Sequence, residues 1–375
     1  MYSHVISSPK TMTLPGLPKA TSPLATCTVR IISPNRVLGV PASAFLTPDI
    51  TGSTTYSDTP CLSFLIEHVP ELEASKSPRR ILFDLGISKD LTMLHPSIQQ
   101  AVVDMGISID TPRDMVEILS DDRIRAENIE SVIFSHHHFD HIGNLSLFPV
   151  STTSLVVGPG FKKNFTPGFP VREDNISIPQ STIEGRVIDE VNFANTDNLA
   201  RPVKEIGGLK AVDWFGDGSL WLLDTPGHAI GHISALVRTT AATSSVERDT
   251  WVLLTGDVCH HAGELRPSVH HQLPQQCLGC LAIHPKDCTN QPFYDPAPGP
   301  WHLDVDTLKD TTALMQAFDA DPDVFVILSH DHWLEGIVDL FPHSANQWKA
   351  KGWDDKVRWR FLKDFEGIIE GRGSQ

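Results

Sequence analysis

The stretch "SHHHFDHIGN" (residues 135–144) places four histidines and one aspartate within six positions, directly after the apolar run Val132-Ile133-Phe134. If the chain is extended where this stretch begins, His136 and His138 point to the same side. Asp140 and His141 then follow on a turn and can face a second point. Because imidazoles packed this closely repel one another when protonated, the stretch indicates metal binding rather than an incidental polar turn.

Apolar runs rich in β-branched or aromatic residues predict buried strands at residues 80–86, 131–138, 154–160, 219–228, 232–238, 251–257 and 324–331. Four runs end directly in a possible ligand: His136, His228, Asp257 and His330. Helices are expected at 97–106, at 111–120 with Thr111 as the N-cap, and at 304–320. This mixture predicts an α/β protein in which helices cover sheet layers and the chemistry gathers at strand ends.

Two coordination shells can be completed from these side chains. We assign His136, His138 and His228 to the first metal, and Asp140, His141 and His330 to the second. The Asp257 carboxylate has two oxygens and can bridge both. Imidazole and carboxylate ligands without thiolate suit two zinc ions and leave iron or manganese open.

The HxHxDH pattern at residues 136–141 and the later ligands His228, Asp257 and His330, in that order, resemble the metallo-β-lactamase superfamily. The resemblance covers roughly residues 25–340 and implies a four-layer αββα sandwich with the metals at one edge of its two sheets. Asp84 in "FDLG" matches a further family position, usually beside the ligands. We expect an N-terminal arm (1–25), a catalytic domain (26–345) with loop insertions at about 161–218 and 259–303, and a C-terminal extension (346–375).

The expected reaction is hydrolysis of a lactone or small carboxylic ester by a hydroxide held between the two metals, which Asp140 could orient. Within the superfamily, β-lactamases generally carry cysteine or serine where this chain has Asp257, and redox diiron members typically lack the second histidine of the motif. The stretches "SHHHFDHIGN", "TPGHAIGH" and "LSHDHW" look most like the acyl homoserine lactone lactonases. Those enzymes often place a tyrosine where this chain has His260, which we predict to lie beside the substrate.

Two other readings stay open. A thioesterase resembling glyoxalase II would need basic residues for its substrate, and only Arg266 follows His260 closely. A metal-dependent small-molecule binding protein without turnover is the alternative of another class.

Composition bears on partners and location. The chain of 375 residues is 40% hydrophobic and has a formal net charge of −16, which opposes binding to nucleic acid or to an anionic membrane. It lacks a run of 18 apolar residues and a secretory signal pattern, so we expect a cytoplasmic protein that acts on a small molecule. The oligomeric state stays open.

Several residues are expected outside the ligand set. His137 should point away from the metals, and His232, Asp331 and His332 should support the site or the fold. "CLGCLAIHPKDC" offers Cys277, Cys280, His284 and Cys288, for which a disulfide or packed free thiols are favoured over zinc. Aromatic residues of the insertions either line an apolar pocket or anchor loops: Trp214, Phe215, Phe293, Tyr294 and Trp301.

Overall fold

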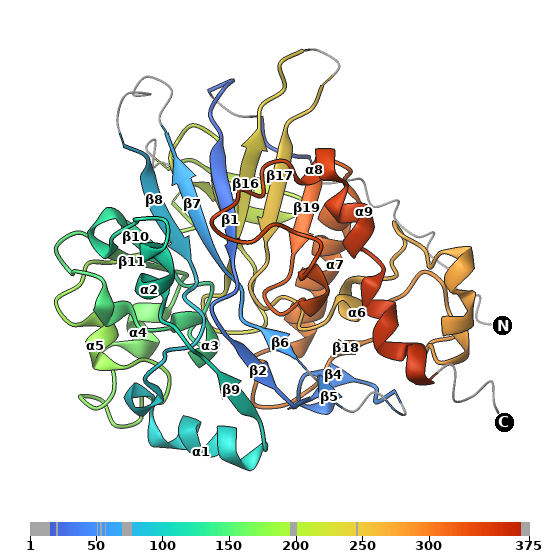
Figure 1. Cartoon of the computed structure of the whole chain (residues 1–375), viewed down its shortest axis with the longest axis horizontal. Helices are drawn as coiled ribbons and strands as arrows, with labels where there is room; N and C mark the ends of the chain where they lie inside the picture. The colour runs from blue at the N-terminus through green and yellow to red at the C-terminus, as the bar shows by residue number, and fades with distance from the viewer. Residues whose placement is uncertain are drawn as a thin grey trace, which may run out of the picture.

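The computed structural model describes residues 16–19, 22–50, 52, 55–56, 58–69, 77–195, 201–244 and 247–368. Most of the expected N-terminal arm lies outside these residues. Two six-stranded mixed sheets form the body (Figure 1). In spatial order, the first holds β1 (Cys27–Ile32), β7 (Ser63–His68), β8 (Arg79–Phe83), β10 (Ser131–Ile133), β11 (Ser154–Val157) and β12 (Ile188–Glu190). The second holds β13 (Val203–Ile206), β14 (Leu209–Asp213), β15 (Leu220–Asp224), β16 (Ile233–Thr240), β17 (Thr250–Leu254) and β19 (Val324–Ile327).

The central strands are apolar on both faces because both faces are covered. On β15, Leu220 and Leu222 join the core between the two sheets, whereas Trp221 and Leu223 face the opposite layer. All four side chains are fully buried. The alternation follows from the two-residue repeat of a strand and explains why these runs read as continuously hydrophobic.

Helices cover the outer face of each sheet (Figure 1). The first sheet is covered by α2 (Met115–Ser120), α3 (Phe139–Ile142), α4 (Phe161–Phe165) and α5 (Gln180–Ile183), whose apolar residues share one core cluster with it. The second is covered by α6 (Ala262–Leu265) and by α7 (Val305–Ala320), which buries Leu308, Met315 and Phe318. This arrangement confirms the predicted αββα architecture.

Shorter elements gather at one end of the sandwich (Figure 1). They comprise the three-stranded sheet β6 (Thr59–Pro60), β2 (Arg36–Leu38) and β9 (Ser108–Asp110), and the pairs β4 (Leu46–Thr47) with β18 (Asp295–Pro296) and β3 (Val40–Pro41) with β5 (Thr55–Tyr56). Helix α1 (Pro96–Asp104) lies nearby. Single 3-10 turns occupy 42–44, 91–93, 126–128, 145–147 and 332–334, and longer 3-10 helices occupy 275–282 and 360–365.

Six of the seven predicted strands end three to five residues earlier than expected, so the four ligands predicted at strand ends lie in the loops that follow them. The structure departs from the sequence expectations at three further places. The helix expected at 111–120 begins at Met115, because Asp114 caps it and the Glu117 carboxylate accepts the Asp114 N–H at 2.8 Å. The segment 161–218 is more than a loop insertion, since it supplies β12, β13 and β14 to the two sheets. In the expected extension after 345, α8 (Trp348–Lys351) and α9 (Trp353–Val357) insert Trp348 and Trp353 into the core between the sheets.

Helix length and composition also bear on membranes. Among the described residues, the structure has no helix with the length and apolarity that spanning a bilayer requires.

Candidate metal centre

The strand directions bring the predicted ligands to one edge of the sandwich. Strands β15 and β17 both run antiparallel to β16, and β19 runs parallel to β17, so the carboxyl ends of these three strands meet. His228, Asp257 and His330 follow those ends. In the first sheet β10 runs parallel to β8, and the histidine-rich loop follows β10 at the same edge. The Ile233 N–H donates to the Ser135 carbonyl at 2.9 Å and ties the two sheets together there.

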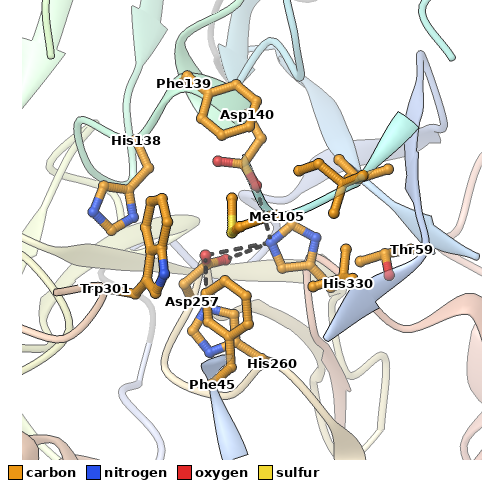
Figure 2. A pocket seen from close by; sticks show the side chains of 13 residues that line it. Phe45, Thr59, Met105, His138, Phe139, Asp140, Asp257, His260, Trp301 and His330 are labelled. Atoms are coloured by element: carbon orange, nitrogen blue, oxygen red, sulfur yellow. Dashed lines mark hydrogen bonds and ion pairs between the residues drawn. The ribbon is translucent and has the colours of Figure 1, made fainter. Parts of the chain in front are cut away.

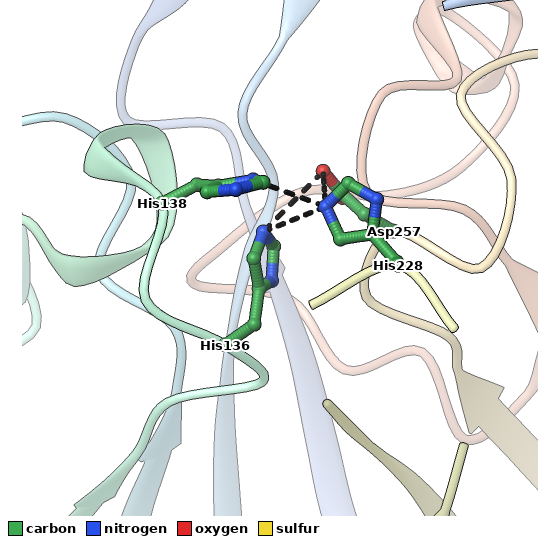
Figure 3. Close-up of side chains that lie close together, drawn as sticks. All are labelled: His136, His138, His228 and Asp257. Carbon is green, nitrogen blue, oxygen red and sulfur yellow. Dashed lines mark hydrogen bonds and ion pairs between the residues drawn. The ribbon is translucent and has the colours of Figure 1, made fainter. Parts of the chain in front are cut away.

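The first group of ligand atoms comprises His136, His138 and His228 with Asp257 (Figure 3). His228 Nε2 lies 3.1 Å from His136 Nε2 and 3.0 Å from His138 Nδ1. Asp257 Oδ2 lies 3.7 Å from His136 Nε2 and 3.6 Å from His228 Nε2. Burial, reinforced by the neighbouring imidazoles, lowers the pKa of all three histidines well below the usual value, so each ring is neutral and offers a lone pair.

The second group comprises His141, Asp257 and His330, with Asp140 beside them. Figure 2 shows Asp140, Asp257 and His330 of this group. Asp257 Oδ1 lies 3.1 Å from His141 Nε2 and 3.2 Å from His330 Nε2. Asp140 Oδ2 lies 3.9 Å and 3.6 Å from the same two nitrogens. His141 Nε2 and Asp257 Oδ1 are buried and, among the described residues, make no contact with hydrogen-bonding geometry. A cation between them would satisfy both.

Further contacts fix which ring nitrogens point into the two groups. His141 Nδ1 donates to Asp84 Oδ2 at 2.8 Å, which leaves Nε2 as the free lone pair. His330 Nδ1 donates to the Pro60 carbonyl at 2.8 Å with the same effect. Asp84 also accepts from the Ser135 N–H and hydroxyl, both at 2.7 Å. Asp84 thus fixes the orientation of the His141 ring, next to the predicted ligands where the family resemblance expects it.

Asp257 carries negative charge into this buried edge. Burial alone would raise its pKa, but His141 and His330 outweigh it and hold the pKa well below the ordinary value. The same carboxylate, with Asp84 and Asp140, raises the pKa of His141 despite burial. The electrostatics therefore favour a cation shared between the Asp257 carboxylate and the second group.

The other histidines near the motif point elsewhere. His137 packs on Phe165 with ring centroids 4.2 Å apart, and burial lowers its pKa to about 4. His232 supports the site from behind, because its Nε2 accepts the Asp257 N–H at 3.0 Å. Asp331 caps the turn at 332–334 rather than orienting a ligand imidazole, and His332 pairs with Asp364 at 3.3 Å.

The second metal candidate, at residues 277–288, shows no ligand cluster of its own among the described residues. Cys277, Cys280 and Cys288 are free thiols. His284 is engaged by the Gln291 carbonyl at 2.9 Å and the Lys286 N–H at 3.1 Å.

A pocket opens over the metal centre (Figure 2). Its empty volume, which includes the open mouth, is about 610 Å³. The lining is mostly apolar: Val37, Val40, Phe45, Thr59, Met105, Ile107, His138, Phe139, Asp140, Asp257, His260, Trp301 and His330. Of the five aromatic candidates, only Trp301 lines this pocket. Trp214 and Phe215 belong to the core between the sheets, and Phe293 and Tyr294 to the core under α6 and α7.

His260 lies where the metal centre meets the pocket wall. Its Nε2 is 3.3 Å from Asp257 Oδ2, and its ring lies against Phe45 at a centroid distance of 4.5 Å. Sequence reasoning missed His302, whose ring centroid lies 5.2 Å from that of His260 and 5.4 Å from that of His228. The signal was weak because His302 sits in a loop away from any strand end.

Comparison with known proteins gives a consistent result. The sequence model of the metallo-beta-lactamase superfamily matches residues 99–330. Gamma-lactamase FDB1 of Fusarium pseudograminearum (strain CS3096) is 38% identical over 88% of this chain and 80% of its own length. Cytochrome P450 monooxygenase mpaDE of Penicillium roqueforti (strain FM164) is 38% identical over 96% of this chain, which spans only 40% of that protein. Among solved structures, a mutant of B. thuringiensis AiiA with N-decanoyl-L-homoserine bound at the active site has a TM-score of 0.52 at 15% identity, and the match covers 86% of this chain and 100% of that one.

Proposed function

The chain belongs to the metallo-beta-lactamase superfamily as a metal-dependent hydrolase, and from this premise we propose that it opens small cyclic acyl compounds, lactones or γ-lactams, with two zinc ions. The observation that carries the proposal is the convergence of metal-ligand atoms at the floor of the pocket. There, lone pairs of six side chains, four of them buried and His138 and Asp140 half-buried, face two points that share the Asp257 carboxylate. Metal cations would satisfy these acceptors together.

The residues at the pocket floor would serve as metal ligands, as a proton acceptor and as a hydrogen-bond donor. His136, His138 and His228 would hold one metal, Asp140, His141 and His330 the other, and Asp257 both. When bound, the metals supply an activated water and polarise the acyl carbonyl. Asp140, whose side chain is 19% exposed, faces the pocket and can accept a proton from that water. His260 Nε2, beside Asp257, can donate a hydrogen bond to the carbonyl oxygen of the substrate as negative charge develops there.

The pocket wall supports a compact, uncharged acyl substrate. The described residues that line it include neither lysine nor arginine. Arg266, the basic residue considered for a glutathione thioester, is buried and bound to Asp319 at 2.9 Å. The name of the Fusarium relative adds support for a ring-opening reaction on a five-membered cyclic amide.

A hydrolysis panel tests the proposal. Zinc-loaded protein would be assayed with γ-lactones of short and long acyl chain, a γ-lactam, an aryl ester, a glutathione thioester and a cephalosporin. We expect a lactone or the γ-lactam to be the best substrate, with activity abolished by chelation and restored by zinc. Thioester turnover at least about tenfold faster, or about 1.4 kcal/mol in transition-state stabilisation, would favour the thioesterase reading. Tight binding without any turnover would favour a binding protein.

The role of His260 is tested with two variants. His260→Ala should lower kcat/KM by about 10²-fold, the effect of losing one oxyanion donor. His260→Tyr supplies a hydroxyl donor at the same position and should recover part of the loss. An unchanged kcat/KM in His260→Ala would remove His260 from the reaction while leaving the metal centre intact.

A further inference from the structure

Cys61 lies beside the second ligand group and plays no part in the site described so far. It follows β6 directly and is 1% exposed. One ligand atom each from Cys61, Asp140 and His330 lie within 4.8 Å of one another. His330 belongs equally to the group with His141 and Asp257. The thiol therefore stands next to a place where four other side chains converge.

Backbone contacts fix Cys61 against His330. The carbonyl of the preceding residue, Pro60, accepts His330 Nδ1–H at 2.8 Å. The N–H of the following residue, Leu62, donates to the Ser329 carbonyl at 2.9 Å, and the Cys61 N–H donates to the Asn35 carbonyl at 3.0 Å. Since the chain is bound on both sides of Cys61, the thiol is held at the metal edge rather than drifting in a loop.

A second observation points to a cation at this place. His141 Nε2 and Asp257 Oδ1 face each other at 3.1 Å, both nine-tenths buried or more, and neither has a hydrogen-bond partner among the described residues. Cys61 also packs in the apolar cluster with Val37, Val40 and Ile87. This packing does not explain why its thiol lies close to Asp140 and His330.

We propose that Cys61 is an additional ligand of the second metal, and that its thiolate makes this site select zinc over manganese. Binding forms a sulfur–metal bond and releases the thiol proton to solvent, because a coordinating thiol is deprotonated. Soft thiolate ligands favour zinc, whereas manganese prefers carboxylate and water. The inference rests on the proposed metal centre and is independent of the substrate.

Cobalt(II) is the probe, because it reports coordination by its colour. Protein freed of metal would be titrated with Co(II) and its absorption spectrum recorded. We expect visible ligand-field bands from bound cobalt and, in the near ultraviolet, a thiolate-to-cobalt charge-transfer band that grows with the second equivalent. Cys61→Ser and Cys61→Val should lose that band and keep the visible ones.

Cys259→Ser is the matched control. Cys259 is also buried and lies two residues from Asp257, but its Sγ faces Thr312 Oγ1 at 3.9 Å. This variant should keep the charge-transfer band. Circular dichroism of each variant would verify that it is folded. If a variant is not folded, the presence or absence of the charge-transfer band in the wild-type cobalt spectrum decides whether a thiolate binds the metal.

Competition with a chelator gives the second readout. Cys61→Ser should weaken zinc at the second site at least tenfold and leave manganese within twofold. Visible cobalt bands without a charge-transfer band in the wild type would overturn the assignment of Cys61 and leave the metal centre standing. Failure to bind cobalt at all would overturn the metal centre itself.

Discussion

Two clusters of buried polar side chains make an instructive comparison: the metal centre, and an ionic cluster formed by Arg266, Asp319, Arg358 and His271. In the ionic cluster each charge has a partner. Arg266 binds the Asp319 carboxylate through two nitrogens and the Arg358 carbonyl at 2.9 Å, and Arg358 Nη1 donates to the Asp319 carbonyl at 2.7 Å.

The metal centre is also largely buried, but its imidazole nitrogens and carboxylate oxygens converge on one another. His141 Nε2 and Asp257 Oδ1 lie 3.1 Å apart out of hydrogen-bonding geometry. Removing one partner from a buried, fully paired charge destabilises a fold strongly, whereas converging acceptors need a ligand to satisfy them. Mutation of the metal centre should therefore lower mainly the activity, whereas mutation of the ionic cluster should lower mainly the free energy of unfolding.

The largest effect is expected at the metal centre. Asp257→Ala removes the carboxylate shared by both ligand groups and should lower kcat/KM by on the order of 10⁴-fold, since the proposed chemistry depends on both metals. Metal analysis should show the bound metal falling from about two ions per chain to one or fewer. A variant that keeps two ions would contradict the bridging role.

The ionic cluster should show the converse. Asp319→Ala leaves Arg266 buried without its carboxylate and should lower the free energy of unfolding by about 3–5 kcal/mol in urea. Activity per folded molecule should stay unchanged. Lys89→Ala is the control, because its ion pair with Glu117 at 3.3 Å is exposed and should contribute less than about 1 kcal/mol. An equal loss of unfolding free energy in Asp319→Ala and Lys89→Ala would show that burial does not strengthen the ion pair of Arg266 with Asp319.

The comparison also explains what the sequence could predict. The αββα fold was predictable because apolar runs of the right length alternate with helices, and the seven side chains meet because each follows a strand end. The pocket wall was not predictable in the same way. Phe45 and Met105 come from loops whose position depends on the pairing of short strands such as β4 with β18, and Trp214 and Phe293 read as loop aromatics although they belong to the cores.

A smaller effect is expected behind the metal centre. Asp84→Asn keeps the shape of the side chain and tolerates the left-handed backbone there, with φ at 58°, but weakens the bond to His141 Nδ1. Loss of such an orienting carboxylate should reduce metal affinity by about 10–100-fold, measured by chelator competition. An unchanged affinity would mean that His141 is held by the backbone alone.

The pH dependence of stability tests the ionic cluster further. Although burial raises the pKa of Asp319, Arg266 outweighs it and holds this pKa well below the ordinary value. Its contribution is therefore complete above about pH 4 and is lost as the pH falls further, by at most about 1.4 kcal/mol per pH unit. The difference in unfolding free energy between wild type and Asp319→Asn should be constant from pH 5 to 7 and shrink toward pH 3. A difference that persists at pH 3 would assign the stabilisation to packing.

The smallest effect should come from the pocket wall, where neither charge nor metal is involved. The Trp301 ring lies 6.2 Å from that of His138 and 5.9 Å from that of Phe45, in the apolar lining above the metal centre. Trp301→Ala removes apolar contact with a substrate that is only partly enclosed, so it should raise KM several-fold, about 1 kcal/mol, with kcat and metal content unchanged. Trp214→Phe is the matched control: it alters an aromatic residue of the core between the sheets, and should lower stability without moving KM. If Trp301→Ala lowers kcat instead, the tryptophan positions the reacting group as well as enclosing it, and the division between a catalytic floor and a passive wall is wrong at that residue.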